Sequence, residues 1–381
     1  MSDIQLYLDD PAQPTVTHPM EYLWGWIKVP DSSGEFDVRI RGERPQFARI
    51  RRRELNPSLH VGFLVFVDML ELAERGKASA QESLVVEFFL DGELIASLPM
   101  NILASASDPL PRLLEDRRTK RAFIESNARR PLNRLEGCRA PSALPDDWSI
   151  DPRMSAKTDA ISAHHYGPSI YEFLNTLPPD AMILEAGAGF RRNPVPNVIN
   201  MEIYDYPSTD ILCIGQDLPF RDDSFDAVLS IAVLEHVDDP FLCAQEIMRV
   251  LKPGGKLYCS IPFLQAEHGY PSHYFNCTRF GMRRLFADLQ LDQQFMELSN
   301  QPIFTLHQIL GLYAHGLRDH PQIRERFLKM TVEELIREAP VDRWLRNEDI
   351  ITALDPEDGW KIAWGTTAVF SKPSSLQIAA A

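Results

Sequence analysis

Short apolar segments alternate with helical segments between residues 182 and 261, and this alternation restricts the fold more than any other feature of the chain. A strand–helix–strand order places successive strands parallel in one sheet, with helices covering its faces. We therefore predict an α/β fold built on a doubly wound, mostly parallel sheet. Its predicted strands have ordinary strand lengths and lie at 182–186, 198–203, 211–213, 227–231 and 256–261.

The first hundred residues show a different pattern, in which apolar and polar side chains alternate over short runs separated by turn residues. An Asp91-Gly92 pair joins two of these runs, and this pair is the strongest short hairpin signal in the chain. We predict a separate, all-β, sandwich-like domain over residues 1–104. Its predicted strands lie at 22–29, 36–40, 61–67, 84–90 and 94–98.

A charged, proline-containing segment at 105–155 separates the two patterns. We interpret it as a linker with one exposed helix at 113–130, and its few apolar residues predict weak coupling between the two halves. The α/β domain then covers 156–381. Within it we expect a helical insertion at about 303–340 and a closing strand at 362–370.

Composition narrows the choice of partner and compartment. The chain has 381 residues, 44% of them hydrophobic, and a net charge of −15, which disfavours attraction to nucleic acid or to an anionic membrane. Its acidic N-terminus differs from an export signal, and no apolar run approaches the ~20 residues of a membrane span. The 5 cysteines are scattered without a CxxC pair. We predict a cytoplasmic protein with no nucleic-acid partner and no membrane span.

The sharpest local signal is a glycine-spaced turn after the first predicted strand of the sheet, where residues 183–189 read Ile-Leu-Glu-Ala-Gly-Ala-Gly. Gly187 and Gly189 would let the backbone turn tightly and approach a ligand closely. Glu202 closes the next strand, where a carboxylate can accept both hydroxyls of a ribose. The pattern indicates a nucleoside-containing cofactor, although a tight strand exit with a solvated glutamate would also produce it.

Four further segments follow in order and carry a family resemblance: Leu-Pro-Phe at 218–220, Ser-Phe-Asp at 224–226, Leu-Glu-His at 234–236 and Leu-Lys-Pro-Gly-Gly at 251–255. With the glycine turn, they make residues 156–372 resemble the class I S-adenosylmethionine-dependent methyltransferases, in the type 11-like branch. The resemblance implies a Rossmann-like fold, with S-adenosyl-L-methionine lying across the strand ends.

The resemblance also implies a set of cofactor-binding residues. Those near the methionine and ribose would be Glu185, Gly187 and Gly189, with Glu202 on the ribose hydroxyls. Residues near the adenine and the sulfonium would be Gln216, Asp217, Leu218, Ile231 and Ala232.

Two departures from the family pattern bear on that site. Ile214 stands where the family commonly has an acidic residue for the adenine, so Gln216 or Asp217 would have to substitute. Only eight residues, 190–197, separate the glycine turn from the next strand, and Pro194 and Pro196 forbid a regular helix there. A dinucleotide needs a helix N-terminus for its pyrophosphate, whereas S-adenosylmethionine carries no phosphate. The short crossover therefore favours the methyl donor.

The loop after the last strand of the sheet, 262–279, is rich in polar aromatic residues and lies where this fold places its acceptor. We predict the catalytic residues His268, His273 and Tyr270 there, a histidine being the base. Each histidine could instead serve only as a loop residue bonded to backbone. Glu235 and His236 could face the acceptor or merely brace the next helix. The histidine spacing suggests no metal site.

Seven arginines at 39–53 form a basic island in an acidic protein. A solvated strand face explains them, as does a docking surface for an anionic ligand or a partner. The Gly-aromatic pattern of 25–92 weakly resembles β modules of bacterial surface-polysaccharide biosynthesis enzymes, which would imply a glycan acceptor.

These observations predict a methyltransferase that acts on a small polar or saccharide acceptor, at an oxygen atom. The alternative is a non-catalytic methyltransferase-like scaffold or binding module in a surface-glycan assembly complex.

Overall fold

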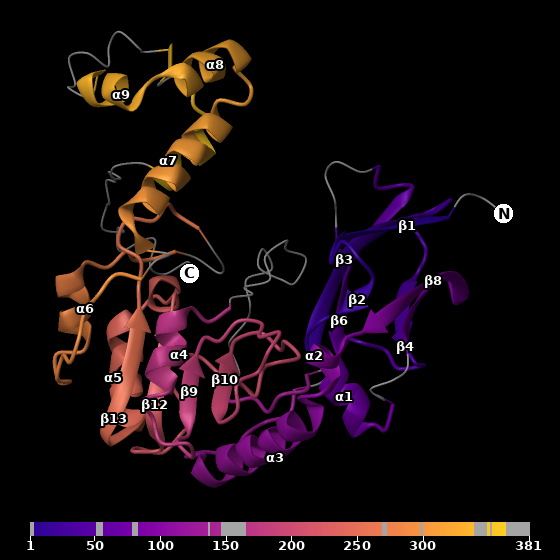
Figure 1. The fold of residues 1–381 in the computed structure, drawn as a ribbon, viewed down its shortest axis with the longest axis horizontal. Coiled ribbons are helices and arrows are strands. Elements are labelled where there is room, and N and C mark those ends of the chain that lie inside the picture. Colours follow the sequence, from indigo (N-terminus) through magenta and orange to yellow (C-terminus); the bar gives the residue numbers. More distant parts are fainter. Residues whose placement is uncertain are drawn as a thin grey trace, which may run out of the picture. The chain divides into compact units, whose positions relative to one another are not determined.

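The computed structural model describes residues 4–50, 56–77, 83–135, 138–145, 165–268, 273–297, 300–338, 349–350 and 353–362. The chain forms two compact units (Figure 1). One comprises Met1–Pro262 with Gly269–Gln293, and the other comprises Phe263–His268 with Gln294–Ala381.

A five-stranded parallel sheet forms the centre of the first unit, in the order β11-β10-β9-β12-β13. β9 and β10 are buried along their whole length, as expected for strands covered on both faces. The strand order reverses between β9 and β12, which is the position where such sheets bind ligands. The predicted parallel sheet is confirmed, with strands β9 (Ile183–Ala186), β10 (Val198–Glu202), β11 (Ile211–Leu212), β12 (Phe225–Ile231) and β13 (Leu251–Ser260).

The connections between neighbouring strands of this sheet differ in whether they contain a helix. α5 (Pro240–Val250) connects β12 to β13 and begins at a proline, with the Asp239 side chain accepting a hydrogen bond from the Leu242 amide. No helix forms between β9 and β10, as Pro194 and Pro196 predict. α4 (Pro168–Leu174) precedes β9, the 3₁₀ turn η2 (Leu234–His236) follows β12, and α6 (Arg279–Leu285) follows β13.

Two four-stranded sheets, largely antiparallel, occupy the N-terminal part, in the orders β1-β3-β6-β5 and β2-β8-β7-β4. The Phe63 and Phe88 rings, 4.8 Å apart, belong to the core that both sheets share. The strands are β1 (Gln5–Asp10), β2 (Thr15–Val16), β3 (Met20–Lys28), β4 (Phe36–Ile40), β5 (Phe47–Ile50), β6 (His60–Asp68), β7 (Leu84–Leu90) and β8 (Glu93–Ile102).

The predicted hairpin joins β7 to β8 at Asp91 and Gly92, whose φ angles are 50° and 82°. Positive φ at both central residues is the type I′ requirement, which explains this residue pair. The alternating pattern does not predict β1, β2, β5 or the helix α1 (Met69–Glu74). The region is therefore largely but not wholly β.

The segment after β8 is helical, with α2 (Ala104–Ser107) and then α3 (Leu110–Asn127). α3 is held on both sides: Arg117 pairs with Asp68 of β6, and Lys120 pairs with Asp210 beside β11. Phe190, from the crossover after β9, is buried in the core of the N-terminal sheets. The expectation of weak coupling is therefore wrong. Phe190 joins the two parts, and so do apolar residues of 105–155 itself: Leu110 and Leu113 lie in the core of the N-terminal sheets, and Ile124 lies in the core of the parallel sheet.

The regular elements described in the second unit are helices, namely α7 (Pro302–Gly316), α8 (Pro321–Lys329), α9 (Val332–Glu338) and α12 (Pro356–Ile362). The Tyr313 and Phe327 rings stack at 4.9 Å beside its small core. Nearly all of the predicted closing strand, 363–370, lies outside the described residues. No helix within the described ranges is long and apolar enough to cross a membrane.

Candidate functional site

The glycine turn links the ends of β9 and β10. Gly187 and Gly189 have φ angles of 83° and 64°, which side chains rarely tolerate. The Gly187 and Ala188 amides both donate to the Met201 carbonyl, at 3.1 and 3.0 Å. A Cβ at Gly187 would lie 2.5 Å from a Val233 methyl, so this glycine allows the segment after β12 to approach the turn.

Glu185, at the end of β9, is 1% exposed and fully paired. The Tyr166 hydroxyl donates to its Oε2 at 2.5 Å, the Arg191 Nε donates to the same oxygen at 3.1 Å, and the terminal guanidinium nitrogen of Arg191 pairs with Oε1. The Arg191 guanidinium also lies 4.5 Å from the Tyr166 ring centroid. Sequence reasoning missed both partners. The available signal was an arginine two residues beyond Gly189, within a crossover too short for a helix.

Glu202 closes β10 and faces the same turn. Its Oε1 accepts from the Gly189 amide at 2.5 Å and its Oε2 accepts from the Ile203 amide at 2.9 Å. Burial raises the pKa of this carboxyl, against the effect of the backbone donors. The structure thus brings Glu185 and Glu202 to the two sides of one glycine turn.

The charges of this site suit S-adenosylmethionine. When ionised, Glu185, Arg191 and Glu202 together carry one negative charge, and the methyl donor carries one net positive charge from its sulfonium, ammonium and carboxylate groups. Buried charges are stable only when they are compensated. The charges of the residues present therefore fit this cofactor.

The residues predicted for the adenine have other partners. The Gln216 side-chain amide donates to Asp238 Oδ1 at 2.7 Å, and the Asp217 carboxylate pairs with Arg129 and Arg130. Leu218 is buried, and its amide donates to Glu246 Oε2 at 2.8 Å. The adenine contact remains a prediction.

After β12, Ile231 and Ala232 lead into η2. Ala232 has a φ of 53°, and its amide donates to the Ser260 carbonyl of β13 at 2.9 Å. Glu235, three residues later, is 0% exposed, and neither of its carboxylate oxygens accepts a hydrogen bond from the described residues. Burial raises the pKa of Glu235 to about 7.

Part of the predicted acceptor loop lies against η2. The Tyr274 amide donates to the Glu235 carbonyl at 2.7 Å, and the His273 ring lies 5.8 Å from the His236 ring. His236 Nε2 is 3.8 Å from a Glu235 carboxylate oxygen. His273 is thus beside a buried acid and a second imidazole.

Of the other two predicted catalytic residues, only His268 lies within the described residues. His268 belongs to the second unit, where its Nδ1 lies 2.8 Å from the Ala266 carbonyl. Tyr270 lies outside the described residues.

The described arginines of the 39–53 stretch contact groups of the β strands. Arg44 donates to Asp37 at 2.6 Å, and Arg39 pairs with Asp37 and covers the Phe89 ring. Arg49 donates to the Gly34 carbonyl at 3.3 Å. These contacts favour the solvated strand face over a docking surface.

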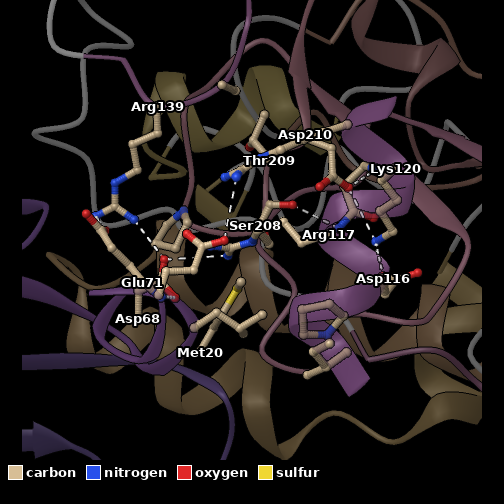
Figure 2. Close-up of a pocket in the computed structure, with 18 of the residues that line it drawn as sticks. Met20, Asp68, Glu71, Asp116, Arg117, Lys120, Arg139, Ser208, Thr209 and Asp210 are labelled. Carbon is tan, nitrogen blue, oxygen red and sulfur yellow. Dashed lines mark hydrogen bonds and ion pairs between the residues drawn. The ribbon is translucent and has the colours of Figure 1, made fainter. Parts of the chain in front are cut away.

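A charged cavity of about 180 Å³ lies between α1, α3 and the segments near β10 and β11 (Figure 2). Its acidic and basic side chains pair with one another, as Arg139 does with Asp68 at 2.9 Å and Lys120 does with Asp116 at 3.0 Å. None of the predicted site residues lines it.

Comparisons with known proteins relate part of the chain to methyltransferases. A family model described as a methyltransferase domain matches residues 194–259. An uncharacterized methyltransferase from Mycobacterium tuberculosis is 40% identical over 82 residues, 20% of this chain and 32% of that protein. Demethylmenaquinone methyltransferase from Bacillus subtilis is 29% identical over 109 residues, 28% of this chain and 47% of that protein. The chain thus spans about a third of the first of these relatives.

An S-adenosylmethionine-dependent methyltransferase from Thermotoga maritima is 19% identical, with a TM-score of 0.23 over 31% of this chain and 67% of that one, a likeness too weak to carry an argument. The part of the chain at 194–259 is thus similar to methyltransferase domains, and the relatives named here that match it are themselves named methyltransferases.

Proposed function

We propose that the protein is an S-adenosylmethionine-dependent methyltransferase that methylates a small polar or saccharide acceptor at an oxygen atom. The observation that carries the proposal is the pair of buried carboxylates, Glu185 and Glu202, on either side of the Gly187–Gly189 turn at the end of a parallel sheet. The match of the following segment to a methyltransferase domain supports it.

The bound cofactor would supply a methyl group from a positively charged sulfur. Glu202 would hold the ribose hydroxyls while its oxygens keep their backbone donors. Glu185, fixed by Arg191 and Tyr166, would add the negative potential that a cationic donor needs. Ile231 and Ala232 would exclude water beside the sulfur, and exclusion of water strengthens every charge interaction there.

On the acceptor side, an alcohol must lose a proton as the methyl group arrives, so a base must lie within hydrogen-bond reach. His273 is supported as that base by its position against η2. His268 and Tyr270 remain further candidates. A saccharide acceptor and a cytoplasmic location in bacteria are the finer parts of this proposal, and the five free cysteines are consistent with a reducing compartment.

Calorimetric titration with S-adenosylhomocysteine tests the proposal. Glu202→Gln keeps an acceptor for the Gly189 amide but removes the charge, so we expect at least ~10-fold weaker binding, since a charge-assisted hydrogen bond contributes ~1.5–3 kcal/mol. The matched control is Asp226→Asn. Asp226 accepts the Met182 amide at 2.9 Å at the amino end of the same sheet, where no cofactor is expected. A wild-type protein that gives no binding heat would refute the proposal.

A further inference from the structure

Residues 189–192 comprise the last residue of the glycine turn and the three residues after it. They contact two parts of the molecule in alternation. The Gly189 amide donates to Glu202, and Arg191 pairs with Glu185, so these two residues serve the proposed cofactor site. Phe190 and Arg192 instead contact the N-terminal β strands. One short segment of the chain therefore contacts both parts.

Phe190 is the apolar half of this junction. Its side chain is 0% exposed and lies in the same core as Phe63 and Phe88. Its ring centroid is 5.1 Å from that of Phe66 on β6 and 6.0 Å from that of Tyr22 on β3. A methyltransferase-side residue thus fills part of the N-terminal core.

Arg192 is the polar half. Its Nε lies 3.1 Å from Glu21 Oε1, a carboxylate that is 1% exposed, and its guanidinium lies 4.3 Å from the Tyr22 ring centroid. A second ion pair reaches Asp10 at 3.1 Å, and the Arg192 carbonyl accepts from the Met20 amide at 3.2 Å. Both backbone and side chain of this residue are therefore held by β1 and β3 or the residues beside them.

The crossover supports the turn without a helix. In most folds of this kind a helix follows the first strand and fixes the turn, but here no helix forms between β9 and β10. Gly187 and Gly189 add backbone freedom rather than rigidity. The path of the chain after the turn is set from two sides. In the parallel-sheet part, Arg191 contacts Glu185 and its amide donates to the Ser208 hydroxyl at 2.9 Å. Phe190 and Arg192 are held by the N-terminal β strands.

We propose that the N-terminal β strands complete the cofactor site, with Phe190 and Arg192 as positioning residues that hold the 187–191 turn in its binding conformation. The inference rests on the proposed cofactor-binding function. It assigns the β strands a role in donor affinity that a detachable module would not have. Packing among Tyr22, Phe66 and Phe190 would then influence how tightly the donor binds.

The test compares Phe190→Ala with Phe88→Ala by calorimetric titration with S-adenosylhomocysteine. Phe88 is 0% exposed in the same core and contacts the Phe63 and Phe36 rings rather than the turn. Both variants lose a buried ring, and titration is done at a temperature where circular dichroism shows both folded. We expect Phe190→Ala to bind at least 10-fold more weakly than wild type, Phe88→Ala within 3-fold of wild type, and Phe190→Leu to recover most of the loss.

Equal affinity of Phe190→Ala and wild type would overturn the inference while leaving the proposed function intact. Equal weakening by both alanine variants would also overturn it, because general destabilisation would then be the cause. If wild type itself does not bind, the proposed function fails and the inference fails with it. Should Phe190→Ala not fold, Arg192→Gln against Arg44→Gln gives the same comparison, and equal affinities of these two variants would overturn the inference.

Discussion

Glu235 is a carboxyl whose pKa the fold raises strongly. It is 0% exposed without a hydrogen-bond donor to its carboxylate among the described residues, and burial raises its pKa from 4.5 to about 7. A buried carboxyl in this situation is neutral below that pH. The titratable groups of the first unit that face it are His236, at 3.8 Å, and Cys259 of β13.

This carboxyl makes the stability depend on pH. Below pH 4.5 it is protonated in both the folded and unfolded states. Between 4.5 and about 7 only the unfolded chain ionises, so stability falls as pH rises, by about 3 kcal/mol in total. Glu235→Gln removes the ionisable group without changing its shape. We therefore expect the unfolding free energy of the variant, relative to wild type, to increase by about that amount between pH 4.5 and 8.

Urea denaturation at several pH values measures this difference. Exposed Glu93→Gln, on β8, is the control and should give a pH profile parallel to that of wild type. Parallel profiles for Glu235→Gln and wild type would mean that Glu235 ionises normally and is paired in solution.

At the scale of elements, α3 shows how a charged helix can brace two parts of a molecule. Lys120 is 2% exposed and pairs with Asp116 of the same helix at 3.0 Å and with Asp210 at 3.5 Å (Figure 2). Asp116 in turn accepts the Asn197 amide at 2.7 Å, just before β10. The charged sequence that suggested an exposed linker helix is in fact partly buried.

Removing the lysine should therefore be costly. Lys120→Ala would leave two carboxylates without their cation in a buried place, and we expect a loss of about 3–5 kcal/mol of unfolding free energy. Arg118→Ala is the matched control on the same helix, since Arg118 and Glu115 form a pair whose side chains are both about 70% exposed. It should cost under ~1 kcal/mol. Similar losses in the two variants, measured by urea denaturation, would contradict the bracing role.

At the scale of the whole molecule, the boundaries of the compact units predict where the chain can be cut. Residues 1–262 belong to one unit although they contain three sheets, because Phe190 and α3 join the β strands to the parallel sheet. A chain of 151–381 would expose Phe190 and lose α3. We expect it to be insoluble or unable to bind S-adenosylhomocysteine.

The complementary truncation is the control. A chain of 1–293 keeps all of the first unit and only residues 263–268 of the second, so we expect it to remain soluble with a cooperative thermal transition. Solubility and scanning calorimetry of both truncations check the prediction. A soluble 151–381 that binds the ligand would show that the β strands are dispensable, in disagreement with the positioning role of Phe190.

The sequence by itself determined the features that depend on local order. Buried apolar runs defined β9, β10 and β12, the Asp91-Gly92 pair defined a type I′ hairpin, and Pro194 with Pro196 excluded a helix from the first crossover. Each follows from the period of apolar side chains or from the φ range of one or two residues. The placement of Glu185 and Glu202 together also follows, because adjacent parallel strands end at the same edge.

Only the tertiary structure decided which distant groups meet. Arg192 pairs with Asp10, 182 residues earlier in the chain, and Phe190 fills a core that its own sequence neighbourhood does not suggest. A local pattern shows that a side chain will be buried but does not specify the surface against which it packs. That surface is set by the path of the whole chain, and it is why the weak coupling predicted from the charged 105–155 segment was wrong.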